Sequence, residues 1–282
     1  MPSPLLRLSV WSLKSSLVIL VLGPLVSAQG ENGYLRGSGG WLVGFSYQEA
    51  EFKETIGQGQ GSVLDVDRKS MSLYLNFGLR DDLDVIIQPL YQKAEFSQFP
   101  IVPAEENLTD IQVYAKWRLW KREIGPGELH FLAAPGLQTD LKNYETDGFL
   151  SLGAGQTDWR ARGIAHYQAR TGSWFAAVET GYDFRTGAPP DNLVIRSQLG
   201  INLGPVLLQP YYDIFDARGG GDEGGVVSGS PQAGGLDYDV WGIKAFVPIG
   251  SHAGIYGGYF ELDDDRPSGV IPGFGFGLVV SG

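Results

Sequence analysis

The chain has 282 residues and a formal net charge of −11 at pH 7, with 43% hydrophobic and 19% charged residues. Its acidic balance excludes the basic surface on which nucleic-acid binding depends. The sequence has no cysteine, which excludes disulfides, thiolate metal sites and a cysteine-linked lipid anchor. The 41 glycines, 16 prolines and 12% aromatic residues are typical of an all-β chain with many turns.

The first 28 residues have the pattern of a secretory signal peptide. Arg7 and Lys14 precede an apolar run over residues 17–22, and a small-residue ending follows at Ala28. The run is shorter than a membrane-spanning helix requires, although a retained anchor is the alternative interpretation. We therefore predict a signal peptide over residues 1–28, and its removal leaves 19 basic and 32 acidic residues, a net charge of −13.

Apolar residues alternate strictly with polar ones over residues 70–79, which predicts a β-strand with one oily face. Residues 110–120 repeat the alternation, and there the polar face carries Lys116 and Arg118. A soluble core would not place these two charges against a neighbouring sheet. We therefore predict a barrel whose oily face meets membrane lipid and whose polar face lines a wet lumen.

The rest of the chain divides into twelve strands, each long enough to cross a bilayer at a steep tilt. Short connections alternate with long polar or glycine-rich ones, as in outer-membrane barrels with periplasmic turns and external loops. The fold class is thus an all-β transmembrane antiparallel up-and-down barrel of about twelve strands, forming a single domain over residues 29–282. The predicted strands are 38–53, 67–79, 83–96, 109–121, 127–140, 155–170, 173–185, 191–203, 206–217, 236–248, 253–263 and 270–281.

Two of these strands depart from the simple pattern. In 236–248, Tyr238 and Val240 begin on the oily face, but Trp241 and Ile243 continue it, so we expect a β-bulge near Val240. The strand 253–263 has aromatic residues on both faces and leaves its register open. In the other strands, tryptophan and tyrosine gather near the ends, as in the aromatic belts of membrane barrels.

Residues on the polar faces are the candidates for lining the lumen. Arginines on the sixth and eighth strands flank carboxylates on the seventh, so we expect ion pairs across the lumen wall. Such pairs fit two interpretations, a structural glue or a constriction that screens solutes. The lining candidates are Asp110, Tyr114, Lys116, Arg118, Asp158, Arg160, Arg162, His166, Glu179, Asp183, Arg196, Gln198 and Asp213. The narrowest part is expected at Lys116, Arg118, Arg160, Arg162, Glu179 and Arg196.

The three histidines, His130, His166 and His252, are the candidates for a catalytic base. None stands in the sequence context used by lipid-cleaving barrels or by outer-membrane proteases. The chain also lacks the nucleophile-elbow, zinc-helix and phosphate-loop motifs. We therefore expect no enzyme activity, no cofactor and no metal site, with His130 and His166 as hydrogen-bonding groups in the lumen and His252 in a turn.

Several segments share the order and chemistry of a known transporter group. They are YLNFGLRDDL at 74–83, LTDIQV at 108–113 with KWRL at 116–119, LGAGQTD at 152–158 and TGYDFRTGAP at 180–189. In these motifs, which cover most of residues 66–217, the chain resembles the outer-membrane barrels grouped as MetA-pathway phenol-degradation transporters. The resemblance implies passive movement of small solutes, hydrophobic or aromatic ones among them, and insertion by the outer-membrane assembly machinery. The chain departs from many such barrels at its end, Leu278 to Gly282, where they carry an aromatic residue for that machinery.

The leading functional hypothesis is a channel or facilitator for small solutes in the bacterial outer membrane. Two alternatives stay open: a non-conducting structural or adhesive barrel sealed by its ion pairs, and an accessory barrel for polysaccharide export. Twelve strands lie between small filled barrels and 16-stranded porins, so both an open and a plugged lumen are compatible with the count. The oligomeric state also stays open, because an oily strand face fits lipid or a second copy equally well.

Overall fold

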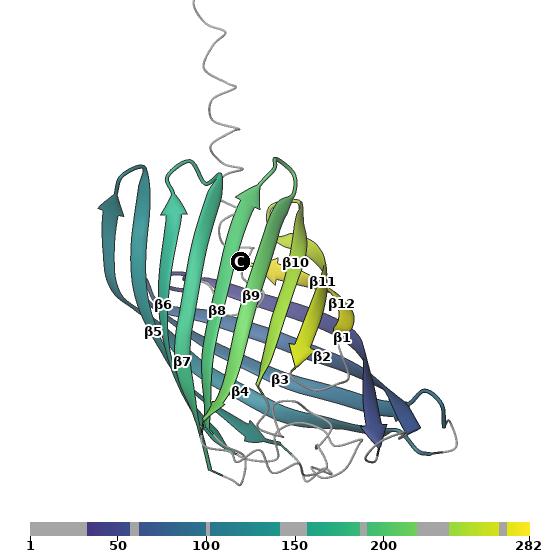
Figure 1. Cartoon of the computed structure of the whole chain (residues 1–282). Coiled ribbons are helices and arrows are strands. Elements are labelled where there is room, and N and C mark those ends of the chain that lie inside the picture. Colours follow the sequence, from purple (N-terminus) through teal and green to yellow (C-terminus); the bar gives the residue numbers. More distant parts are fainter. Residues whose placement is uncertain are drawn as a thin grey trace, which may run out of the picture.

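Twelve antiparallel strands form a closed barrel in the computed structural model, which describes residues 33–56, 62–99, 102–141, 157–186, 191–218, 237–264 and 270–282 (Figure 1). Each strand pairs with its neighbours in sequence, and β1 pairs with β12 to close the sheet. The predicted barrel and its strand count are therefore confirmed. The predicted signal peptide lies outside the described residues, and none of the described segments is a helix long and apolar enough to cross a membrane.

The strands are 11 to 20 residues long. Their bounds are β1 Trp41–Ile56, β2 Ser62–Arg80, β3 Leu83–Phe96, β4 Glu105–Ile124, β5 Gly127–Asp140, β6 Asp158–Ala169, β7 Trp174–Arg185, β8 Asp191–Asn202, β9 Leu207–Arg218, β10 Tyr238–Ile249, β11 Ala253–Asp264 and β12 Ile271–Ser281.

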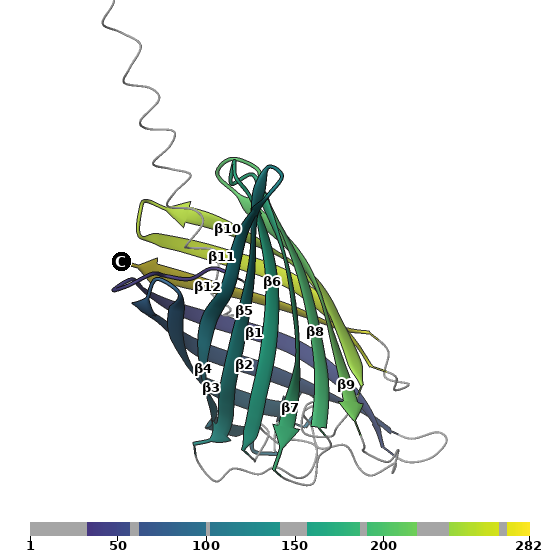
Figure 2. The same ribbon diagram turned by 90° about the vertical axis from the view of Figure 1, so that its left-hand side faces the viewer.

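The two ends of the barrel differ in their connections. The short ones all lie at one end, here called the turn end, and the long ones at the opposite loop end (Figure 2). Gly125, Gly172, Gly204 and Gly250 adopt positive φ in four of the short turns, a conformation that L side chains disfavour. At the same end β1 begins and β12 finishes, where the Trp41 and Gly282 backbones exchange hydrogen bonds of 3.0 and 3.2 Å.

The outer surface of the barrel is apolar, and the inner surface is mostly polar. On β2, Leu73 and Phe77 are 40% and 41% exposed, whereas Tyr74 and Asn76 between them are 1% and 0% exposed. Large apolar side chains are exposed in the same alternating way on the other strands. Such an exterior would be a liability in water, but it is what a surrounding bilayer requires.

Aromatic side chains on the outer surface gather toward both ends. Near the turn end the belt contains Trp41, Trp117, Trp120, Tyr167 and Trp174. Toward the loop end, tyrosine hydroxyls donate to outward-facing carboxylates, with distances of 2.8 Å for Tyr47 to Glu49, 2.5 Å for Tyr212 to Asp239 and 2.6 Å for Tyr259 to Glu261. These amphipathic rings mark the levels at which the strands leave the hydrocarbon of a bilayer.

The structure corrects the expected β-bulge in β10. The strand pairs without a register shift along both neighbours, from Tyr238 onward. Tyr238 and Val240 face the lumen, where they join an apolar cluster, while Trp241 and Ile243 face outward. The bulge was inferred because apolar residues were assumed to face lipid, and at this level of the barrel the interior is apolar as well. β11 also pairs in unbroken register on both sides.

Candidate functional site: the barrel lumen

Residues 33–40, which precede β1, enter the lumen at the turn end. The ring of Tyr34 packs edge-on against His166 of β6 and Phe175 of β7, with centroid distances of 4.6 and 5.4 Å. Leu35 packs beside a buried cluster on β5 and β6. Burial raises the pKa of the Tyr34 phenol and lowers the pKa of the Arg36 guanidinium. This segment, called the lumen segment below, occupies the interior between the strands.

Backbone hydrogen bonds hold the lumen segment to the wall. The Gly33 N–H donates to Nδ1 of His166 at 3.3 Å, and the Ser38 N–H donates to Asp81 at 3.1 Å. The Gly39 N–H donates to the Gly78 carbonyl at 2.9 Å. Gly78 has to be a glycine here, because a Cβ atom would collide with the Gly37 carbonyl oxygen.

Two apolar layers cross the lumen at different heights. The turn-end layer comprises Leu42, Tyr74, Ile86, Phe175, Leu207, Phe246 and Val279, with Tyr34 packed against it. The loop-end layer comprises Val66, Ala94, Val194, Phe215, Tyr238, Leu262 and Ile271. Both layers draw side chains from most of the strands around the barrel, so each narrows the interior.

An alternating chain of six charged side chains lies between the two layers. Beginning on β6, Arg160 pairs with Asp183 at 3.7 Å, and Asp183 pairs with Arg162 at 2.5 Å. Arg162 continues to Glu179 at 3.3 Å, and Glu179 continues to Arg196 on β8 at 3.2 Å. Arg196 ends the chain at Asp213 on β9, 3.7 Å away.

The six residues from Arg160 to Asp213 are called the charge chain below. Their pairing follows the prediction that arginines on the sixth and eighth strands flank the carboxylates of the seventh. Their role as a constriction stays a prediction. Because every charge has an opposite neighbour, the cost of holding ions in a confined interior is reduced.

The neutral amide of Gln138 on β5 connects the charge chain to Asp110 on β4. Gln138 accepts from the Arg160 guanidinium and donates to Asp110 at 3.1 Å. Beside it, Asp158 lies 3.9 Å from Arg185, an arginine that sequence reasoning did not place in the lumen. The polar network therefore reaches from β4 to β9, along one half of the lumen wall.

Lys116 and Arg118 occupy different places, although both were expected at the narrowest part. Lys116 is fully buried and lies within electrostatic reach of Asp84, Arg36 and Glu179. Arg118 lies at the turn end, where its guanidinium donates to the Asp81 carbonyl at 2.9 Å. The structure therefore brings Lys116 close to the charge chain and places Arg118 at the rim.

Of the other candidates, Tyr114 packs against the turn-end layer and Gln198 lines a pocket near the charge chain. Sequence reasoning missed Asp84, which contacts the lumen segment, and the lumen-facing Tyr211 and Lys244. The signal for Lys244 was present, because it alternates with the outward residues Ile243 and Ala245.

Each of the three histidines lies within hydrogen-bond distance of another described residue. His166 accepts from the lumen segment and stacks on Phe175 at 5.4 Å. Nε2 of His130 lies 3.3 Å from Glu128, and Nδ1 of His252 lies 3.2 Å from the Ser281 carbonyl in the turn. Within the ranges that the structure describes, no three histidine or acidic side chains are grouped to hold a metal ion.

No family model and no curated protein matches the chain. Among solved structures, the COG4313 outer membrane channel from Pseudomonas putida F1 is similar, with a TM-score of 0.63 and 13% identity over 91% of this chain and 100% of that one. The fold is that of bacterial outer-membrane channels. The NanC porin also matches, with a TM-score of 0.51 and 6% identity over 83% of this chain and 98% of that one.

An outer membrane phospholipase A from Escherichia coli matches less well, with a TM-score of 0.42 and 10% identity over 92% of this chain and 96% of that one. This likeness carries no argument about activity, and the absence of catalysis stays a prediction. Together, the outer-membrane barrel fold and the apolar exterior place the chain in a bacterial outer membrane.

Proposed function

We propose that the protein is a channel or facilitator for the passive passage of small solutes across the outer membrane. The observation that carries the proposal is the charge chain, which lines the interior of a closed membrane barrel from β6 to β9. A barrel that served only as an anchor could fill the same space with apolar side chains, which often stabilise a protein as well as buried ion pairs do. The resemblance to phenol-degradation transporters supports hydrophobic or aromatic solutes among those that pass.

The lumen segment shapes how such a channel would work. It occupies the turn end of the interior and contacts β3, β6 and β7 through Asp84, His166 and Phe175. With the turn end facing the periplasm, a solute would meet the loop-end layer first, then the charge chain, and the lumen segment last. Passage would therefore be narrow and selective for small molecules.

One observation favours the alternative of a sealed structural barrel. Tyr74, Lys116 and His166 are each at most 1% exposed, so the turn-end half of the interior is tightly filled. A sealed barrel would need no solute path, and its ion pairs would act as structural glue.

Liposome swelling separates the two functions. The chain without residues 1–28 is refolded into vesicles, and swelling is followed in isotonic solutions of glycine, arabinose and sucrose. A channel predicts measurable entry of glycine, with slower entry of the larger solutes. Asp84→Ala removes the carboxylate that binds the backbone of the lumen segment. If neither the wild type nor Asp84→Ala admits any solute, the channel function is wrong and the sealed barrel is supported.

Ion selectivity tests the residues assigned to the path. Replacing both Arg160 and Arg162 with alanine leaves Glu179 and Asp183 with less positive charge around them. The reversal potential in a KCl gradient should then shift toward cation preference. The control replaces Arg80 and Arg170, whose exposed side chains lie at the turn end, and this pair should leave selectivity unchanged. Equal ion selectivity in all three proteins would show that Arg160 and Arg162 do not line the path.

A further inference from the structure

An aromatic slot lies on the lumen wall where β6 and β7 pair. Its walls are the rings of His166 and Phe175, which stack with their centroids 5.4 Å apart. A Cβ atom at Gly200 of β8 would collide with the Phe175 ring, and a Cβ atom at Gly33 would collide with the His166 side chain. The Phe175 ring therefore lies against the barrel wall, and the backbone of the lumen segment comes directly up to His166.

The slot is occupied by the chain itself. Tyr34 of the lumen segment presents its ring edge-on to both walls, at 66° to the His166 ring and 82° to the Phe175 ring. Edge-to-face contacts are an arrangement that aromatic rings prefer. His166 and Phe175 are both buried, so the Tyr34 ring helps to cover ring surface that would otherwise face the lumen.

One hydrogen-bond donor in the slot has no partner. Nδ1 of His166 accepts from the Gly33 N–H at 3.3 Å, so the neutral imidazole carries its proton on Nε2. Nε2 is buried and has no hydrogen-bond partner among the described residues. A buried donor without an acceptor costs free energy, which an oxygen atom of a bound molecule would recover.

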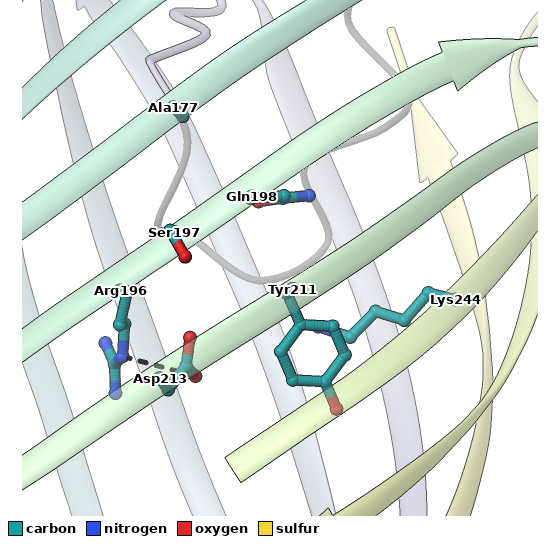
Figure 3. Close-up of a pocket in the computed structure, with 7 residues that line it drawn as sticks. All are labelled: Ala177, Arg196, Ser197, Gln198, Tyr211, Asp213 and Lys244. Carbon is teal, nitrogen blue, oxygen red and sulfur yellow. Dashed lines mark ion pairs between the residues drawn. The ribbon is translucent and has the colours of Figure 1, made fainter. Parts of the chain in front are cut away.

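The slot adjoins the polar part of the lumen. Ala177 is directly opposite His166 in the antiparallel register of β6 and β7. The same alanine lines a pocket whose wall includes Arg196 and Asp213 of the charge chain (Figure 3). A molecule that reaches the charge chain would therefore have the slot beside it.

The occupant of the slot is not part of the barrel wall. Tyr34 precedes β1, lies outside all twelve strands and is only partly buried. Its ring can therefore be regarded as a tethered ligand. A free ring would compete with it against the effective concentration that the tether provides.

We propose that the slot is a binding site for an uncharged aromatic molecule with an oxygen atom, and that such a molecule displaces the ring of Tyr34. The proposal rests on the proposed function and gives its solute a site. The incoming ring would take over the edge-to-face contacts of Tyr34, and its oxygen atom would accept from Nε2 of His166. An ion does not fit, because two rings and one neutral donor do not replace its hydration.

Isothermal titration calorimetry of the chain without residues 1–28, in detergent micelles, tests the site without requiring transport. The first probe is p-cresol, which is the tyrosine side chain as a free molecule. Three matched probes each change one property: 4-methylcyclohexanol lacks the aromatic ring, toluene lacks the oxygen atom and 4-methylbenzoate adds a charge. After subtraction of binding to empty micelles, p-cresol should bind about fivefold more tightly than each of them. A matched probe that binds as tightly as p-cresol would overturn the proposal.

Variants of Tyr34 test whether p-cresol binds in the slot. Tyr34→Ala vacates the slot and should tighten p-cresol binding by about tenfold or more, because the tethered competitor is gone. Tyr34→Phe keeps a ring there and should stay closer to the wild type. Tyr259→Ala removes an outward-facing tyrosine and should leave binding unchanged. Equal affinity in the wild type and Tyr34→Ala would overturn the proposal, and so would a wild type that shows no saturable binding.

A substitution in the wall of the slot provides a second route to the same answer. In the Tyr34→Ala background, Phe175→Leu removes one ring wall and should weaken p-cresol binding about fivefold. Phe131→Leu makes the same exchange on the outer surface and is the matched control. Heat-modifiable gel mobility verifies that each variant is folded, and unchanged binding in folded Phe175→Leu would contradict the site.

The transport function is tested separately by liposome swelling. A barrel that binds p-cresol in the slot but admits no solute would contradict the channel function and leave the site standing. A barrel that admits glycine but does not bind p-cresol would contradict the site and leave the channel function standing.

Discussion

The backbone N–H of Arg36 donates to both carboxylate oxygens of Asp84, at 3.1 and 2.9 Å. Asp84 stands at the second position of β3, and its side chain is completely buried. It also lies within electrostatic reach of Lys116 and the Arg36 guanidinium. One carboxylate thus fixes the lumen segment to the wall and balances the cations around it.

Removing this carboxylate should open the barrel. Asp84→Ala loses both acceptors and removes a negative charge that stabilises the Lys116 cation, whereas Asp84→Asn keeps one oxygen acceptor. Single-channel conductance in planar bilayers should rise from the wild type to Asp84→Asn and again to Asp84→Ala. Asp82→Asn, in the adjacent turn and away from the lumen segment, serves as the control. Identical conductance in all four proteins would show that the lumen segment does not limit the path.

A substitution without any change of charge should have the same effect. Gly78→Ala places a methyl group where the Gly37 carbonyl lies, so the lumen segment has to move away from β2. Conductance should increase relative to the wild type. Gly163→Ala is the matched control, because its Cβ would point outward with its nearest neighbour 3.9 Å away, in ordinary van der Waals contact. A rise in both variants would indicate a general loosening of the barrel.

Glu179 should matter more to stability than an exposed carboxylate. It forms ion pairs with both Arg162 and Arg196, and it is 3% exposed. Glu179→Gln leaves the buried Arg162 side chain and the partly exposed Arg196 side chain each with one carboxylate fewer, and it should lower the free energy of unfolding by about 3 kcal/mol. Glu123→Gln breaks an exposed pair with Arg170 and should cost at most about 1 kcal/mol. Urea unfolding in lipid vesicles measures both, and equal losses would contradict the energetic importance of the charge chain.

Neighbouring residues on β4 should differ in how far the same new charge destabilises the barrel. Val113 faces outward near the middle of the strand, and Gln112 faces the lumen. Val113→Lys puts an ammonium into the bilayer interior and should destabilise the barrel by about 2–4 kcal/mol. Gln112→Lys meets a polar interior and should cost less than about 1 kcal/mol. The same urea titration compares the two, and equal costs would show that β4 has been assigned the wrong faces.

The fold was largely predictable because lipid imposes one rule on every strand. Residues 83–96 and 127–140 were predicted as strands with the bounds of β3 and β5, since tight polar turns flank strong alternation. The pairing of Arg162 and Arg196 with Glu179 followed from strand order alone. In an up-and-down barrel, strands that follow one another in sequence pair with one another in space. The alternation within each strand therefore predicts which side chains of two neighbouring strands face the same side.

The interior was predicted less well, because apolar residues also face inward. Phe175 and Phe246 lie in the lumen, where the rule that oily residues meet lipid gives the wrong side. The same rule produced the expected bulge at Val240. The place of the lumen segment was not predictable, because the hydrogen bonds from Gly33, Arg36, Ser38 and Gly39 to the wall come from backbone groups that any sequence carries.

In the proposed channel, the two apolar layers would select solutes by hydration as well as by size. An inorganic ion crossing either layer would lose hydration water that the aliphatic and phenyl side chains there cannot replace, whereas the charge chain between the layers offers charged partners. A molecule with an oily body loses little at the same two levels. The proposed channel would therefore leak little salt even with an interior wide enough for a small organic solute.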